Sequence, residues 1–214
     1  MDYQLFHLIN QLAGHSALLD SIMRTIANYG PVVFILPLLY VWFRNGVEGK
    51  KAALLALASM GIALLIGQVI GHIYFRPRPF ASHEVNLLVG RSTDASFPSD
   101  HATFSFAIAW VLWFQDRRVG WVSLALGTII AFSRVFVGTH YPLDVFGGAM
   151  LGLGTGLLMG AGPWLVEHLG EPANQVFQGI AAVLGVSLAV QLILLLPIFL
   201  VRRLLNRLTG LKVV

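Results

Sequence analysis

Long apolar stretches separated by short polar segments run along most of the chain. Each is near or within bilayer-spanning length, and they cover residues 18–43, 52–75, 101–114, 119–139, 143–166 and 179–201. Because a transmembrane helix needs about 20 mostly apolar residues, the pattern predicts an all-α, polytopic transmembrane helical bundle of about six spans. Gly30-Pro31 interrupts the first stretch, which could therefore be an interfacial helix leading into a shorter span rather than one straight rod.

The first residues form a weaker pattern. Leu5, Leu8, Ile9 and Leu12 recur at helical spacing, which predicts a short N-terminal amphipathic helix in the membrane interface; a disordered terminus is the alternative. Asp2 and the absence of an early Lys or Arg argue against a cleaved secretory signal.

The composition supports a membrane protein. Hydrophobic residues make up 57% of the 214 residues and charged residues 11%, far from a soluble domain's balance. Six spans leave no room for a second domain, so residues 1–214 are predicted to be one domain. The chain has no cysteine, which excludes disulfides, thiolate nucleophiles and cysteine-bound metals.

The basic residues lie in short clusters beside the apolar stretches rather than in a patch suited to nucleic acid. The turns after the first and third stretches hold Arg44, Lys50, Lys51, Arg117 and Arg118. The positive-inside tendency places these turns in the cytoplasm and the intervening loops outside. Strict alternation then puts the basic C-terminal tail outside as well, contrary to that tendency.

A row of small residues marks the fifth stretch. Gly148, Gly152, Gly156 and Gly160 are four residues apart and share one helix face, which lets another backbone approach closely. Packing within the monomer is the favoured interpretation, and a homodimer seam is the alternative.

Two polar segments flank the boundary between the second and third stretches. Arg76-Pro77-Arg78-Pro79 ends the second; its prolines favour a non-helical backbone, and arginine suits phosphate because its planar fork donates paired hydrogen bonds. Pro98-Ser99-Asp100-His101 precedes the third. Ser99 suits an N-cap beside a helix-terminal anion site, and His101 could exchange a proton with a bound phosphoester. Taken alone, the two arginines could contact only lipid headgroups, and the second segment could be a simple helix cap with an interfacial histidine.

A third polar segment, Ser133 to Asp144, joins the fourth and fifth stretches. Arg134 and Asp144 are the only fully charged residues between Val119 and Val166, and charges at membrane depth are functional candidates, with a structural ion pair as the alternative. His140 and Asp144 are within reach if the turn that joins them is helical. A carboxylate at one imidazole nitrogen would leave the other as a nucleophile.

Alternation of the spans brings all three polar segments to one membrane face. Together they supply cationic clamps, a helix-terminal anion site, two histidines and a carboxylate, the groups needed for phosphoryl transfer through a phosphohistidine. A metal site is disfavoured because the nearby arginines would repel a divalent cation.

These segments resemble the three-part signature of the type 2 phosphatidic acid phosphatase superfamily of membrane lipid phosphatases. Ser133-Arg134, His140 and Asp144 match the third part completely in spacing, and the catalytic core covers about residues 70–166. The resemblance implies an α-helical bundle and a reaction without a metal or other cofactor.

The resemblance also implies a role for each site residue. His140 would attack phosphorus, Asp144 would orient it, and His101 would protonate the leaving oxygen and later activate water. Arg78, Ser99 and Arg134 would hold phosphate oxygens.

The sequence departs from the family pattern at two positions. Gly71 stands where the family usually has a Lys seven residues before Arg78. Either His72 or Arg76 supplies the missing charge, or Arg78 and Arg134 suffice, and the sequence does not choose between these alternatives. Asp100 replaces the commonest Gly at the phosphate-binding segment and would repel substrate unless it faces away, pairs with an arginine or is protonated.

The Pro-Ser-Asp-His variant is similar to the BcrC-type undecaprenyl-diphosphatases of bacteria. It implies hydrolysis of a polyprenyl diphosphate, held among membrane lipids, on the outer face of the cytoplasmic membrane. A phosphatidylglycerophosphate or phosphatidate phosphatase is the nearest alternative, and a non-enzymatic lipid transporter or anion-binding membrane protein is a further one.

Overall fold

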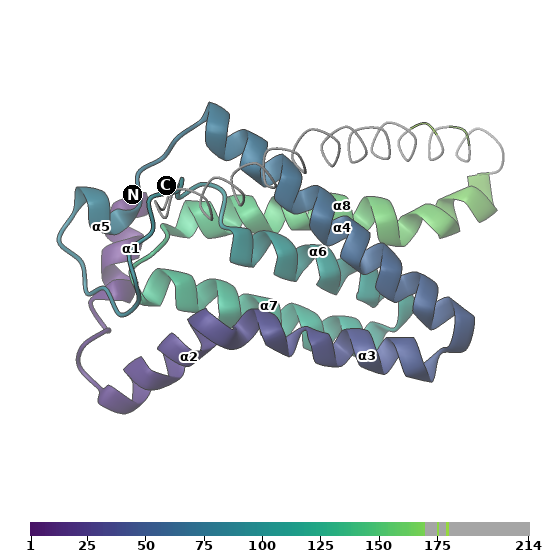
Figure 1. Ribbon diagram of the computed structural model, residues 1–214, viewed down its shortest axis with the longest axis horizontal. Coiled ribbons are helices and arrows are strands. Elements are labelled where there is room, and N and C mark those ends of the chain that lie inside the picture. Colours follow the sequence, from purple (N-terminus) through teal and green to yellow (C-terminus); the bar gives the residue numbers. More distant parts are fainter. Residues whose placement is uncertain (170–174, 176–178, 180–214) are drawn as a thin grey trace, which may run out of the picture. The chain divides into compact units, whose positions relative to one another are not determined.

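The computed structural model describes residues 1–169, 175 and 179. Residues 1–163 form one compact unit, which holds every site residue discussed below, and residues 164–214 form a second. The described ranges contain helices and no strands: α1 Asp2–Asn10, α2 Ala17–Val33, α3 Ile35–Arg44, α4 Gly46–Ile73, α5 Pro79–Ser82, α6 Asp100–Gln115, α7 Arg117–Phe136 and α8 Pro142–Leu169 (Figure 1).

The prediction of a polytopic transmembrane α-helical protein is confirmed. In the described part of the chain, four helical segments are long and apolar enough to span a membrane: Ala17–Arg44, Gly46–Ile73, Arg117–Phe136 and Pro142–Gly162. Helix α6 covers the predicted third span but has only 16 residues. The predicted stretch 179–201 lies outside the described residues, so a count of six spans is not established.

The first span is divided near its middle. Pro31 lies inside α2, and because proline has no backbone N–H, the helical hydrogen-bond pattern weakens there. Helix α2 ends at Val33 and α3 begins at Ile35. A Cβ at Gly30 would lie 2.7 Å from the Ile130 side chain, so this glycine lets α2 pack closely on α7.

Helix α6 lies at the centre of the bundle, against α4 and α7 (Figure 1). The predicted glycine face of α8 packs on α6 of the same chain. A Cβ at Gly148 would lie 2.5 Å from the Ser99 carbonyl oxygen, and one at Gly156 would lie 2.6 Å from Cβ of Trp110. The glycines therefore permit a backbone approach that any side chain would prevent.

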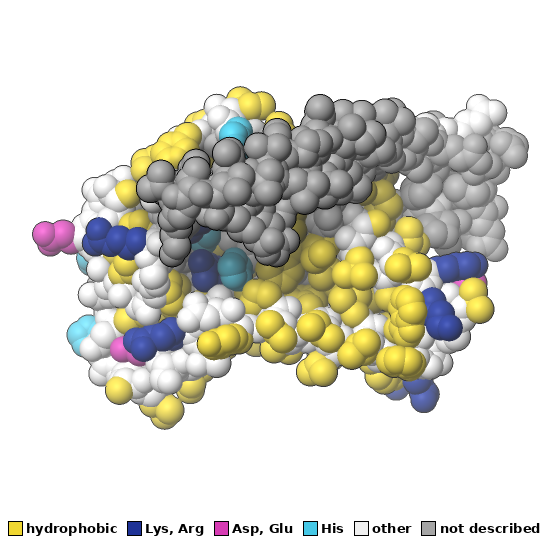
Figure 2. Space-filling model, in the orientation of Figure 1, with side chains coloured by type: hydrophobic (Ala, Val, Ile, Leu, Met, Phe, Trp, Pro, Cys, Tyr) yellow, Lys and Arg dark blue, Asp and Glu magenta, His cyan; other side chains and the backbone are white. Residues whose placement is uncertain are grey.

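The outer face of this unit suits a lipid environment. Figure 2 shows hydrophobic side chains gathered over the middle of the visible face, with Lys and Arg side chains toward both ends. Leu36, Phe43 and Trp121 are among the large apolar side chains that are more than half exposed. Burying such side chains in lipid removes their contact with water, as expected for membrane-facing helices.

Candidate active site

The three polar segments predicted from the sequence meet at one end of the bundle. This is the end where α4 finishes, α6 begins and α7 turns into α8, beside α1 and α5 (Figure 1). The alternation of spans explains the meeting, since each connection on this side returns the chain to the same membrane face.

A tight turn between α7 and α8 presents His140. Gly138 follows the last residues of α7 with φ +86°, a left-handed conformation that glycine adopts without steric cost and that commonly ends helices. The amides of Thr139 and His140 both donate to the carbonyl of Arg134, at 3.1 and 3.3 Å. Arg134 and His140 are thereby fixed relative to each other through the backbone.

Both ring nitrogens of His140 have defined partners. Nε2 is 2.9 Å from Nη1 of Arg78, and Nδ1 is 2.8 Å from the carbonyl oxygen of Ser96. A guanidinium can only donate and a carbonyl can only accept, so Nδ1 carries the proton and Nε2 carries the lone pair. The surroundings of His140 thus select the tautomer in which Nε2 is the nucleophilic atom.

The protonation state of His140 suits the same role. Burial lowers the pKa of its imidazole to about 4; Asp144 opposes this shift, and the charges of Arg78 and Arg134 add to it. The side chain is only 2% exposed. His140 is therefore neutral near pH 7 and needs no other base to free its lone pair.

Asp144 lies in a fully buried position and has a partner on each oxygen. Oδ1 accepts from Nη1 of Arg76 at 2.6 Å, and Oδ2 accepts from the Ser96 hydroxyl at 2.5 Å and the Tyr141 amide at 2.8 Å. The distance from Oδ2 to Nδ1 of His140 is 3.8 Å, longer than a hydrogen bond. Asp144 therefore lies beside His140 without a direct hydrogen bond to it. Its influence on the imidazole passes through Ser96 and the backbone of Tyr141.

Ser96 connects His140 to Asp144, although no pattern in the sequence indicates this. Its carbonyl accepts from His140, its hydroxyl donates to Asp144, and its amide donates to the carbonyl of Arg76 at 2.8 Å. The side chain is fully buried. One loop residue therefore fixes the ring plane of His140 and the position of Asp144 together.

His140 lines a cavity of about 220 Å³, and Arg78, Arg134, His101, Asp94 and Asp100 are among the other residues that line it. The Arg78 and Arg134 side chains are 7% and 9% exposed. Their Nε atoms are buried without a hydrogen-bond partner, as is the hydroxyl of Ser99, at the start of α6. Unpaired buried donors are costly, so this group is suited to bind an anion.

Asp94, from the loop before α6, neutralises part of this positive charge. Its Oδ2 accepts from Nη2 of Arg78 at 2.9 Å. Partial burial alone would raise the pKa of Asp94, but hydrogen bonds from Ser92 and Arg78 hold that pKa below its ordinary value. Arg78 is therefore held between Asp94, His140 and the Thr139 carbonyl.

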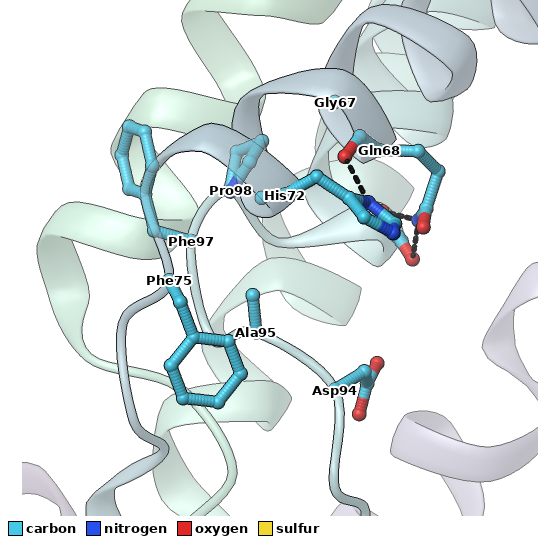
Figure 3. Close-up of a pocket in the computed structure, with 10 residues that line it drawn as sticks. Gly67, Gln68, His72, Phe75, Asp94, Ala95, Phe97 and Pro98 are labelled. Carbon is cyan, nitrogen blue, oxygen red and sulfur yellow. Dashed lines mark hydrogen bonds between the residues drawn. The ribbon is translucent and has the colours of Figure 1, made fainter.

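A second cavity, of about 330 Å³, adjoins the first and shares Asp94 and Asp100 with it. Gly71 lines this second cavity. Figure 3 shows Gln68 and His72 projecting from α4 on one side and Asp94 on the other. Gln68 donates to Asp100 at 3.2 Å, so Asp100 has a neutral amide partner rather than an arginine.

Comparison with known proteins agrees with this geometry. The family model described as the PAP2 superfamily matches residues 52–165. The chain belongs to the PAP2 superfamily. It is 39% identical to undecaprenyl-diphosphatase BcrC of Bacillus subtilis over 74% of this chain and 82% of that protein. It is 31% identical to an undecaprenyl-diphosphatase of Sulfolobus acidocaldarius over 70% of this chain and 72% of that protein.

A solved structure of the PAP2 fold supports the membership. The crystal structure of Aquifex aeolicus LpxE aligns with a TM-score of 0.63 and 28% identity, covering 74% of this chain and 93% of that chain. The family resemblance inferred from the three polar segments is confirmed.

Most of the site residues predicted from the sequence line the cavity beside His140, and the others lie around it. His140, His101, Arg78, Arg134 and Asp100 line the cavity of about 220 Å³, and Ser99 is the N-cap residue of α6 without a side-chain capping bond. Asp144 lies behind His140. Arg76, predicted to bind phosphate, instead donates to Asp144 and to Asp2, each at 2.6 Å.

The residues predicted to supply the charge missing at Gly71, His72 and Arg76, do not line the cavity that holds His140. His72 lines the adjoining cavity, and its Nδ1 is 2.9 Å from the carbonyl of Gln68. Arg76 is held by two carboxylates. Arg78 and Arg134 are therefore the arginines that face His140 in the described part of this PAP2 chain.

Proposed function

We propose that this chain is a lipid diphosphate phosphatase that hydrolyses undecaprenyl diphosphate to undecaprenyl phosphate and inorganic phosphate. One observation carries the proposal: His140, whose Nε2 carries the lone pair, lines one cavity together with two buried arginines. A neutral nucleophile beside fixed positive charge is the arrangement that phosphoryl transfer requires. The similarity to named undecaprenyl-diphosphatases supports the substrate class.

In the first step, Nε2 of His140 attacks the terminal phosphorus and forms a P–N bond. The bond from phosphorus to the bridging oxygen breaks, and undecaprenyl phosphate leaves with that electron pair. Burial and the charge of Arg134 lower the pKa of His101 to about 3 without substrate, so His101 is the proton donor once the bound diphosphate anion has raised that pKa and protonated the ring. Arg78 transfers its hydrogen bond from Nε2 to a phosphate oxygen as the lone pair is used. Arg134 and Ser99 hold the other oxygens, so negative charge is stabilised where it develops.

In the second step, water attacks the phosphohistidine. His101 accepts the proton of the water, the P–N bond breaks, and the electron pair returns to Nε2. Inorganic phosphate leaves, and Arg78 donates to Nε2 once more. Proton transfer by a positioned histidine in both directions returns the site to its starting state.

The site belongs at the outer surface of the bacterial cytoplasmic membrane in this proposal. The end of the bundle that holds His140 lies opposite the beginnings of α4 and α7, which carry Lys50, Lys51, Arg117 and Arg118. Basic turns favour the cytoplasmic side. We further propose that residues 1–214 act as one phosphatase domain, with the polyprenyl tail remaining in lipid.

The substrate assignment is tested by side-by-side phosphate release. Purified protein in detergent is given undecaprenyl diphosphate, phosphatidylglycerophosphate and phosphatidate, and kcat/KM is measured for each. We expect the highest value for undecaprenyl diphosphate, because its leaving group is a stable phosphate monoester. A large preference for either glycerolipid would overturn the substrate assignment and favour the glycerolipid phosphatase alternative.

A further inference from the structure

The N-terminal helix reaches the active site through its first residue. Asp2 accepts from Nη2 of Arg76 at 2.6 Å with Oδ2 and from the Leu143 amide at 3.0 Å with Oδ1. Arg76 uses its other terminal nitrogen, Nη1, for Asp144. A continuous path of charged contacts therefore joins Asp2, Arg76 and Asp144.

The rest of α1 is firmly docked beside the site. Phe6 is 1% exposed, and its ring centroid lies 5.6 Å from that of Tyr141, next to His140 in sequence. Asn10 donates to the carbonyls of Phe136 and Asn86 at 2.8 and 2.9 Å. The predicted amphipathic helix thus packs on the end of α7 and the loop before α6, which fixes Asp2 at a set distance from α8.

The geometry of Arg76 is set by three neighbours. Asp2 and Asp144 each bind one terminal nitrogen, and Cζ lies 4.1 Å from the ring centroid of Tyr141. Because both terminal nitrogens and one face of the guanidinium are in contact with neighbours, the side chain has little rotational freedom. Nη1 therefore remains in contact with Asp144. The Leu143 amide, in the first turn of α8, also gains an acceptor that the helix itself does not provide.

We propose that Asp2 and Arg76 are positioning residues for the nucleophile, so that α1 completes the active site of the proposed phosphatase. Asp2 holds Arg76, Arg76 compensates the buried charge of Asp144, and Asp144 fixes the Ser96 hydroxyl and the Tyr141 amide beside His140. Neither Asp2 nor Arg76 lines the cavity. Their effect on catalysis therefore passes through the orientation of the His140 ring.

The inference rests on the proposed function and is tested by steady-state kinetics on undecaprenyl diphosphate. In D2N the charge that holds Arg76 is lost, and kcat is expected to fall by roughly 10-fold to 100-fold, the cost of a small misplacement of a reacting group. KM should stay within about twofold, because Asp2 does not touch the cavity. D2E, which keeps the charge, should recover most of the loss.

A matched control is Asp20→Asn. Asp20 also accepts a hydrogen bond from a backbone amide, that of Gly14, with both oxygens at 3.1 Å, but it forms no ion pair with an arginine of the described residues. D20N should retain wild-type kcat. In a double-mutant cycle, D2N should cause no further loss in an R76Q background, whereas a merely structural effect of D2N would persist there.

The outcomes separate the two proposals. Wild-type kcat in D2N, a rise of KM without a fall of kcat, or an undiminished D2N effect in R76Q would each overturn the positioning role and leave the phosphatase proposal intact. A wild-type protein that releases no phosphate from any of the three lipids would overturn the proposed function and this inference together.

Discussion

Replacing His140 by alanine is expected to lower phosphate release from undecaprenyl diphosphate by about 10⁴-fold or more, the usual scale for removing a covalent nucleophile. Nε2 of His140 carries the lone pair and lies 2.9 Å from Nη1 of Arg78, and His140 lines the same cavity as Arg78 and Arg134. Without this nitrogen, only binding and electrostatic stabilisation by the arginines would remain.

The measurement is inorganic phosphate released under saturating lipid substrate. His140→Asn is the second variant, because its amide can keep a hydrogen bond to the Ser96 carbonyl and so preserve the fold. His15→Ala is the control, since His15 is exposed and outside the site. A thermal melt in detergent confirms that each variant is folded. Activity within tenfold of wild type in both His140 variants would exclude this nucleophile.

Asp144→Asn is expected to cost about 10³-fold to 10⁴-fold in kcat, close to the effect of the equivalent change in a catalytic triad. Asp144 accepts hydrogen bonds from three donors with its two oxygens. The side-chain amide of asparagine has one oxygen, which accepts hydrogen bonds, and one NH₂ group, which donates them. The NH₂ group would face either Arg76 or the Ser96 and Tyr141 donors, and the donors on that side would lose their acceptor. The Ser96 carbonyl and the His140 ring then shift together.

The control for D144N is Asp116→Asn, the same chemical change at the partly buried N-cap of α7. Asp116 accepts from the Arg118 and Val119 amides at the start of α7, and asparagine caps helices about as well as aspartate. D116N should keep wild-type kcat. A D144N variant with kcat within tenfold of wild type would show that the buried carboxylate does not fix the nucleophile.

The sequence predicted the parts of this site that follow from periodicity and topology. Apolar stretches located most helices to within a few residues, as at α6, predicted over 101–114 and observed as Asp100–Gln115. Alternating spans then required Arg78, His101 and His140 to share one membrane face, and all three line one cavity. The spacing of His140 and Asp144 correctly indicated proximity, since their side chains are 3.8 Å apart.

The contacts missed from the sequence come from segments without periodicity. Ser96 and Asp94 lie in an irregular loop, where no repeating pattern indicates which side chains point inward. Nothing in the sequence around Asp2 indicates a role at the site, yet Asp2 accepts a hydrogen bond from the amide of Leu143, 141 residues away. The partner of His140 Nδ1 is a backbone carbonyl, and the sequence cannot reveal it because every residue has one.

The most direct test of the central claim is detection of phosphate on His140 during turnover. Undecaprenyl diphosphate labelled in its terminal phosphate is mixed with wild-type protein and with a His101→Ala variant. The variant lacks the group that activates water, whereas the first step expels a phosphate, a leaving group that depends less on a proton donor, so the intermediate accumulates. The reaction is quenched in base. We expect protein-bound label that is stable to base, lost in acid, mapped by mass spectrometry to His140, and absent from His140→Asn. Turnover with no label in either protein, or label that persists in His140→Asn, would contradict the account.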